Sequence, residues 1–176
     1  NSGPGGTSGV FVHERFANRP DLVRFAGWWG HDEKERFLMK KGFKPMEGAA
    51  GWQLSNAQIF PMAIHKASLE LFAEAGMENL RAKSVLLTGY LEFILREFSD
   101  HLSIITPPDP NQRGCQLSII VKENGKALFD YLCAHNIIPD WREPDVIRMS
   151  AVPMYNSFED IFHVGITVGS QRINSQ

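Results

Sequence analysis

The sequence has few cysteines and no long apolar run, and both shortages narrow the class of protein. Its 176 residues include only Cys115 and Cys133, and this pair has no spacing typical of a disulfide framework, so we expect a reducing, cytoplasmic setting. The longest apolar runs, such as residues 118–121, are far too short to cross a bilayer. The composition therefore predicts a protein that does not cross a membrane.

The sequence also lacks a surplus of charge of either sign. It contains 18 Lys and Arg against 20 Asp and Glu, for a formal net charge of −2. A nucleic-acid or membrane-surface partner normally leaves a strong basic bias, so we expect neither. The share of hydrophobic residues, 43%, against 22% charged residues is typical of a folded globular protein rather than a disordered one.

Common catalytic motifs are missing too. Gly3-Pro-Gly-Gly6 has neither the phosphate-loop nor the dinucleotide-binding spacing, so it is interpreted as a turn. No G-x-S-x-G elbow and no Cys/His constellation occurs. We expect no metal site, because the histidines form no H-x-x-x-H pair; they are His13, His31, His65, His101, His135 and His163.

Hydrophobic patterning predicts two different halves. Residues 9–13 are rich in β-branched and aromatic types and predict a strand, and residues 14–50 carry scattered Gly and Pro and predict a long irregular segment. Apolar residues at helical spacing then predict one helix after Ser55-Asn56 and a second over residues 80–98. Beyond these helices the pattern predicts strands at 102–105, 116–121 and 146–149 and helices at 126–135 and 158–165. The fold class is therefore α/β and α+β, with long helices leading into a small α+β lobe.

Two candidate sites lie in the first half. Gly27-Trp-Trp-Gly-His31 places an indole pair in a Gly-rich segment, where the indole of Trp28 can donate and the backbone can approach a ligand closely; the alternative is that both indoles are buried at a domain boundary. Ser55 and Asn56 stand at an expected helix start, where free N–H groups suit an anion. The alternative there is a plain N-cap.

A third candidate is Arg148, which lies among apolar residues in an expected strand. A guanidinium in such a place requires a carboxylate partner, and its planar fork suits a ligand carboxylate bidentately. The alternatives are an ion pair with a neighbouring Asp or Glu, or a place on the solvent face of the sheet.

Taken together, these segments resemble kynureninase, a pyridoxal 5'-phosphate (PLP) enzyme of the fold-type I, aminotransferase-like superfamily. The similarity runs through most of the chain in the family's order. The segments that carry it are Asn1-Ser-Gly-Pro-Gly-Gly6, Phe11-Val-His-Glu14, Gly27-Trp-Trp-Gly-His31, Leu54-Ser-Asn56, Leu86-Leu-Thr-Gly-Tyr-Leu-Glu92, Ile105-Thr-Pro107, Arg113-Gly-Cys-Gln-Leu117, Asp140-Trp-Arg-Glu-Pro144 and Ile147–Phe158.

The resemblance implies a role for each candidate. Trp28 matches the tryptophan whose indole binds the PLP phosphate, and Asn56 matches the asparagine that lines the cofactor and substrate pocket, with Ser55 beside it. Arg148 matches the arginine that binds the α-carboxylate of the substrate. Trp29 stands where other members carry Phe, and Ala57-Gln58 replaces an expected Pro-Pro, so the shape of the pocket differs.

The resemblance also implies how much of the family's enzyme is present. It covers the C-terminal part only, with residues 1–55 as the last piece of the PLP-binding large domain and residues 56–176 as the helices and small domain. The Schiff-base lysine is expected upstream of Asn1, so we expect no catalytic residue in this chain. It matches none of the eight lysines, which are Lys34, Lys40, Lys41, Lys44, Lys66, Lys83, Lys122 and Lys126.

The implied function is hydrolysis of L-kynurenine or 3-hydroxykynurenine to anthranilate or 3-hydroxyanthranilate and L-alanine, in tryptophan catabolism. The implied partners are the N-terminal portion of the same enzyme and a second copy in a homodimer. Two alternatives remain: a non-catalytic dimerisation or binding module, and another fold-type I enzyme such as a class V aminotransferase or a cysteine desulfurase relative. Cys115, in an expected strand, does not match the catalytic loop of a desulfurase.

Overall fold

The computed structural model describes residue 3 and residues 5–174, with side chains up to residue 171. The chain divides into two compact units, the first ending at Phe72 and the second beginning at Ala73. The sequence places a domain boundary after residue 55 instead, and the assignment of residues 1–55 to a large domain stays a prediction. The helices and strands are α1 (Glu14–Ala17), α2 (Ile59–Ala75), α3 (Met77–Arg96), β1 (Leu102–Ile104), β2 (Gln116–Val121), α4 (Gly125–Ala134), β3 (Asp140–Arg142), β4 (Val146–Ser150) and α5 (Phe158–Asn174), with short 3-10 turns at Gly48–Trp52 and Pro110–Gln112.

The first unit is largely irregular, as the sequence predicts for residues 14–50. The strand expected at residues 9–13 is wrong, because this segment pairs with no other strand among the described residues. A strand exists only as part of a hydrogen-bonded ladder, and here the side chains of Val10 and Phe11 are exposed. Residues 9–13 have the side chains that favour a strand, but no neighbouring strand among the described residues pairs with them.

The helix α2 begins three residues after Asn56. Ser55 and Asn56 therefore lie in the segment before the helix, and the prediction that one of them caps its N-terminus is wrong. All 17 residues of α2 are exposed or half-buried, although many are apolar. Ile59, Phe60 and Ile64 each expose three quarters or more of their surface.

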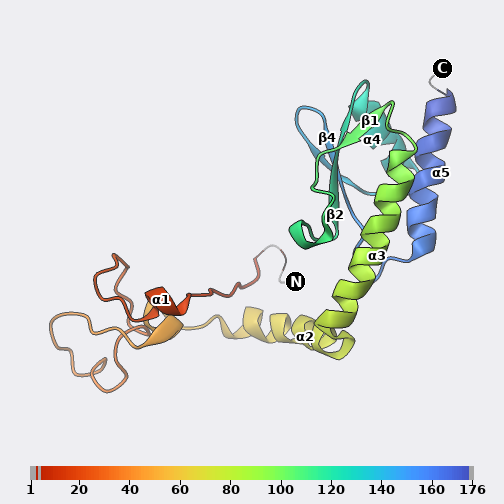
Figure 1. The fold of residues 1–176 in the computed structure, drawn as a ribbon. Helices are drawn as coiled ribbons and strands as arrows, with labels where there is room; N and C mark the ends of the chain where they lie inside the picture. Colours follow the sequence, from red (N-terminus) through yellow and green to blue (C-terminus); the bar gives the residue numbers. More distant parts are fainter. Residues whose placement is uncertain (1–2, 4, 175–176) are drawn as a thin grey trace. The chain divides into compact units, whose positions relative to one another are not determined.

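The second unit is built on a four-stranded antiparallel sheet with the order β1-β2-β4-β3 (Figure 1). Side chains alternate between two faces along a strand, so Leu117, Ile119 and Val121 of β2 are buried while Gln116, Ser118 and Ile120 are only half-buried. The strand β4 alternates in the same way, burying Ile147 and Met149. The sheet thus has one apolar face and one more polar face.

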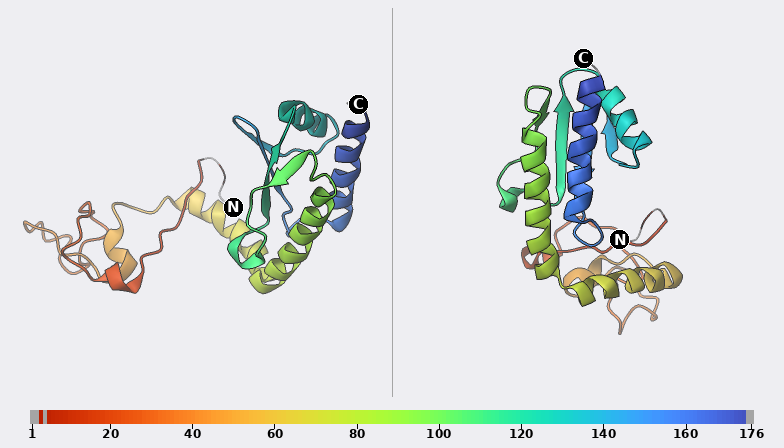
Figure 2. Two further views of the ribbon diagram at one scale, coloured as in Figure 1. Left: turned by 45° about the horizontal axis from the view of Figure 1, so that its top comes forward. Right: turned by 90° about the vertical axis from the view of Figure 1, so that its right-hand side faces the viewer.

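Helices cover the apolar face of the sheet. In both views of Figure 2, α3 and α5 run side by side along it, and their backbones approach closely enough that a Cβ on Gly165 would lie 2.6 Å from Cγ2 of Ile94. The core that results contains Leu87, Leu91, Leu95, Leu102, Leu117, Ile119, Leu128, Leu132, Ile147, Ala151, Ile161 and Val168.

The predicted fold class is confirmed by this mixture of helices and sheet. The expected strands and helices of the second unit all form within three residues of their predicted bounds, except that α5 continues well past residue 165. The strand β3 was not expected, and Cys115 lies one residue before β2 rather than within a strand. These two differences lie at the ends or edges of the sheet, where apolar alternation is shortest.

Candidate functional site

The segment that carries Trp28 packs against the chain just before Ser55. A Cβ added to Gly27 would lie 2.3 Å from the carbonyl oxygen of Gln53 and 2.3 Å from Cα of Leu54. Real side chains do not tolerate such distances, so glycine is required here. The glycine at position 27 therefore allows a close approach to another part of the backbone, not to a ligand as the sequence suggested. This contact brings Trp28 and the Ser55-Asn56 segment into one region of the first unit.

Backbone hydrogen bonds hold this region together. The amide of Met46 donates to the carbonyl of Gly30 at 2.8 Å, and the amide of Asp32 donates to the carbonyl of Lys44 at 2.7 Å. The amide of Lys44 donates to Nδ1 of His31 at 3.3 Å. These bonds fix the loop that carries the indole pair without a helix or a sheet.

The two indoles of the pair have different surroundings. Trp28 exposes 59% of its surface and meets the ring of Phe37 edge-on at 5.8 Å, so burial does not account for it within the described chain. Trp29 is half-buried and lies under the guanidinium of Arg36, 4.5 Å from its ring centroid. Trp28 is therefore the more accessible of the two indoles.

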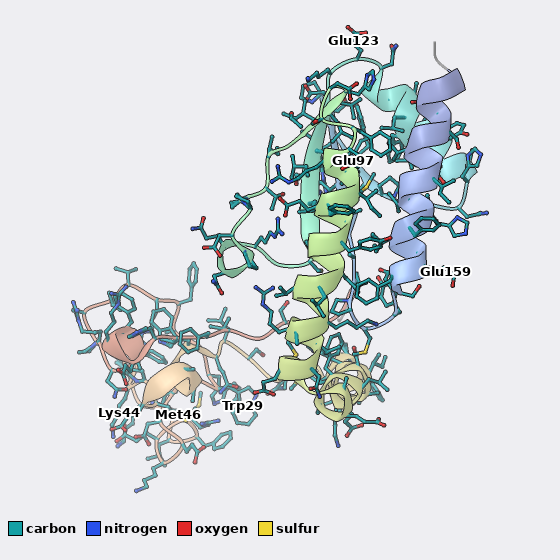
Figure 3. The ribbon with its side chains drawn as sticks, turned by 45° about the vertical axis from the view of Figure 1, so that its right-hand side comes forward. Trp29, Lys44, Met46, Glu97, Glu123 and Glu159 are labelled. Carbon is teal, nitrogen blue, oxygen red and sulfur yellow. The ribbon has the colours of Figure 1, made fainter. Side chains whose placement is uncertain are left out.

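Sequence reasoning missed Arg36. It is 8% exposed, its Nη2 donates to the sulfur of Met46 at 3.4 Å, and its buried Nε has no hydrogen-bond partner among the described residues. Figure 3 labels Trp29 and Met46 in the irregular part of the first unit. It supports Trp29 through a cation–π contact, and no motif in the sequence marked it.

Arg148 lies on the polar face of the sheet and is paired. Asp140 of β3 stands directly opposite it in the register, and Nε of Arg148 donates to Oδ2 of Asp140 at 2.6 Å. Nη2 of Arg148 donates to the same oxygen. The ion pair with a neighbouring Asp, which the sequence left open, is therefore present.

A second arginine joins this pair. Nε of Arg142 donates to Oδ2 of Asp140 at 2.9 Å, so one carboxylate joins two guanidinium groups. The hydrogen bond from Arg148 is the main cause that lowers the pKa of Asp140 from its ordinary value, and the charge of Arg142 adds to it. Asp140 therefore stays ionised to a lower pH than a free aspartate does. Its pairing with two arginines was not predicted because β3 was not expected.

The neighbouring strand β2 adds neutral polar groups to this face. Ser118 stands opposite Arg148 in the β2–β4 register, and Nε2 of Gln116 donates to Oγ of Ser118 at 3.3 Å. A guanidinium bordered by hydroxyl and amide groups on a half-buried face suits a small anionic ligand.

The structure thus places the sequence candidates in two groups. Trp28, Ser55 and Asn56 lie together in the first unit, and both Ser55 and Asn56 are exposed. Arg148 lies in the second unit. Within the described chain, no three His, Cys, Asp or Glu side chains gather closely enough to hold a metal ion. None of its described helices has both the length and the apolar character to span a bilayer.

Comparison with solved structures relates the fold to PLP-dependent enzymes. The cystine C–S lyase C-DES, solved with its product cysteine persulfide, superimposes with a TM-score of 0.59 over 82% of this chain and 37% of its own, at 18% identity. A NifS-like protein gives a TM-score of 0.56 over 74% of this chain and 40% of its own, at 19% identity. Identities this low establish the fold alone.

Sequence comparison is more specific. Kynureninase of Stenotrophomonas maltophilia is 54% identical over 167 residues, covering 93% of this chain and 39% of that protein. Kynureninase of Flavobacterium johnsoniae is 52% identical over 169 residues, covering 94% of this chain and 40% of that protein. The chain therefore spans about two fifths of the length of these relatives. Residues 80–167 match the family of the kynureninase C-terminal domain, and with half of its length in that match the chain belongs to the kynureninase family.

Proposed function

We propose that this chain is the C-terminal part of a PLP-dependent hydrolase that cleaves a carbon–carbon bond of L-kynurenine or 3-hydroxykynurenine. The products are anthranilate or 3-hydroxyanthranilate and L-alanine. The observation that carries this proposal is Arg148, a guanidinium fixed on the polar face of the sheet within the region that matches the family. Its role in the reaction is to bind the α-carboxylate and orient the substrate.

The first unit offers groups that fit the cofactor. Trp28 presents an exposed indole, whose N–H is a donor suited to the phosphate, and the exposed amide of Asn56 can both donate and accept at the edge of the pocket. Ser55 adds a hydroxyl beside it. When bound, PLP supplies an electron sink for the reacting carbon atoms. The residues of this chain bind and orient, and the Schiff-base lysine is supplied by the large-domain portion.

Two features support the proposal that another portion of the enzyme, which carries the Schiff-base lysine, packs against this chain. The chain spans about two fifths of the length of its relatives. In addition, α2 exposes a run of large apolar side chains, including Ile59, Phe60 and Ile64, and exposed apolar patches of this kind mark surfaces that another element covers. We propose that the large-domain portion of the same enzyme and a second copy in a homodimer provide this cover.

We propose a cytoplasmic setting, which the two thiols support. Cys115 and Cys133 are both free and half-buried, which fits a reducing, cytoplasmic compartment.

The direct test is an activity assay of the complete enzyme, meaning this chain together with its large-domain portion and PLP. L-kynurenine is supplied, and anthranilate and L-alanine are quantified by chromatography. We expect equal amounts of the two products. L-cystine, supplied in parallel, separates the alternatives: persulfide formation without anthranilate indicates a C–S lyase, and turnover of neither substrate indicates a non-catalytic module.

A further inference from the structure

The ion pair at Arg148 uses only one edge of the guanidinium. Nε and Nη2 form the side edge of the planar fork, and both donate to Oδ2 of Asp140. Nη1 of Arg148 has no hydrogen-bond partner among the residues that the structure describes. Because a guanidinium has five N–H donors, the end edge formed by Nη1 and Nη2 keeps donors for a second carboxylate.

The neighbouring charges leave this cluster positive. Asp140 joins Arg142 and Arg148, so two guanidinium groups share one carboxylate and one positive charge remains. Glu143, the first acid after β3, instead accepts a hydrogen bond from Nε1 of Trp141 at 2.8 Å. That indole packs against Phe129 of α4, on the helix-covered side of the sheet. One further carboxylate would therefore balance the charge of this three-residue cluster.

We propose that Asp140 is a positioning residue for Arg148, holding its side edge so that the end edge receives the α-carboxylate of the substrate. This inference rests on the proposed function, since it takes Arg148 as the carboxylate-binding group. The arginine side chain has many rotamers, and a fixed partner removes that freedom before the ligand arrives. The cross-strand register sets the geometry, because Asp140 and Arg148 are directly opposed on neighbouring antiparallel strands.

Asp140 could instead block Arg148, and this role predicts the opposite effect of its removal on substrate binding. If Asp140 blocks the fork and must leave when substrate binds, then its removal strengthens binding. The shared use of Oδ2 by both arginines favours positioning, because displacement of Asp140 would break the bonds to Arg142 as well as those to Arg148.

The test compares variants of the complete enzyme with L-kynurenine and with its α-carboxamide. We expect Asp140→Ala to lower kcat/KM for L-kynurenine by about tenfold to a hundredfold, mainly through KM, and Asp140→Asn, which keeps an acceptor, to lower it less. With the carboxamide the loss falls below about threefold, because the carboxylate contact is absent. Asp145→Asn, a change of the same kind in the β3–β4 turn, is the matched control and leaves both substrates unaffected.

Three outcomes separate this inference from the proposed function. Unchanged or tighter binding in Asp140→Ala, together with a large loss in Arg148→Gln, overturns the positioning role and leaves the function intact. Equal losses for L-kynurenine and the carboxamide indicate a merely structural role and also overturn it. Unchanged kinetics in Arg148→Gln overturn the carboxylate-binding role in the proposed function.

A second measurement does not depend on turnover. In a crystal structure of the complete protein with bound L-alanine, we expect the carboxylate oxygens within hydrogen-bond distance of Nη1 and Nη2 of Arg148, with Asp140 still on Nε. A carboxylate on the Nε edge with Asp140 displaced, or no carboxylate at Arg148 under saturating L-alanine, contradicts the proposal.

Discussion

The two units of this chain bury different kinds of residue. Among the described residues of the first unit, the buried ones are Gly27, Gly30, Arg36 and Gly51. In the second unit, by contrast, α3, α4, α5 and the sheet enclose a continuous apolar core. All the buried apolar side chains of the described chain lie at Leu80 or beyond.

The two units are therefore stabilised by different interactions. Burial of apolar area is the main stabilising contribution in most domains, and the second unit has it. The first unit relies on close backbone contacts and on Arg36 stacked over Trp29. Its exposed residues include Trp28 and Asn56, so the proposed cofactor-binding groups lie in the unit that depends most on other parts of the enzyme.

The largest expected effect tests the core of the second unit. Leu87 is 0% exposed and its neighbour Leu86 is 63% exposed on the same helix. We expect Leu87→Ala to lower the free energy of unfolding by about 2–5 kcal/mol, and Leu86→Ala to change it by less than about 0.5 kcal/mol. Urea denaturation followed by circular dichroism measures both, and equal losses would contradict the assignment of the core.

The next effect concerns the ion pair that joins α3 to the loop before β2. Nη2 of Arg113 lies 2.6 Å from Oε2 of Glu92, and these side chains are only 6% and 12% exposed. We expect Arg113→Ala to cost about 1–3 kcal/mol, because Glu92 loses its buried partner. Arg96 contacts the same carboxylate but is 61% exposed, so Arg96→Ala, measured by the same denaturation, serves as the control with a smaller loss.

A glycine substitution tests whether close backbone contacts stabilise the first unit. We expect Gly27→Ala to push the Trp28 segment away from Leu54, because its Cβ would meet backbone atoms, at a cost of about 1 kcal/mol. Limited proteolysis between residues 27 and 54 should then be about fivefold faster. Gly9→Ala, where a Cβ meets nothing within 4 Å, is the control; equal cleavage of the two variants would show that the close contact has no structural role.

The smallest effect is a dependence of stability on pH. Burial of the Glu92 carboxylate opposes its ionisation, but the hydrogen bonds from Arg96 and Arg113 outweigh burial and lower the pKa of Glu92 below its ordinary value of 4.5. This stabilisation is therefore complete above about pH 4.5 and is lost as the pH falls toward the lower pKa of the folded state. Melting temperatures between pH 7 and pH 3 should show a weaker decline in Arg113→Ala than in the unmodified chain, and parallel curves would contradict this assignment.

The second unit was the more predictable of the two from sequence. Alternation along residues 116–121 and helical spacing over residues 80–98 reflect burial on one face, so periodicity located β2 and α3. The three residues of β3 are too short to alternate, and its exposed edge leaves no apolar pattern. For that reason the sequence did not place Asp140 beside Arg148, and it did not decide which group pairs with Arg148.

In the first unit, local pattern was a poorer guide. Residues 9–13 have strand-forming types without a partner strand among the described residues, and Ser55 and Asn56 precede rather than cap α2. Trp28 and Asn56 were selected from the indole pair and the expected helix start, the resemblance to the family gave them roles at the cofactor, and those roles stay predictions. Arg36 carries no motif of its own and became visible only through its stacking on Trp29.

Amide hydrogen exchange tests most directly the claim that the rest of the enzyme completes the first unit. Exchange is measured in this chain alone and in the complete enzyme with PLP. We predict that α3, β2 and β4 are protected in both samples, whereas residues 9–58 and α2 gain strong protection only in the complete enzyme. Equal protection of the first unit in the two samples would contradict this account.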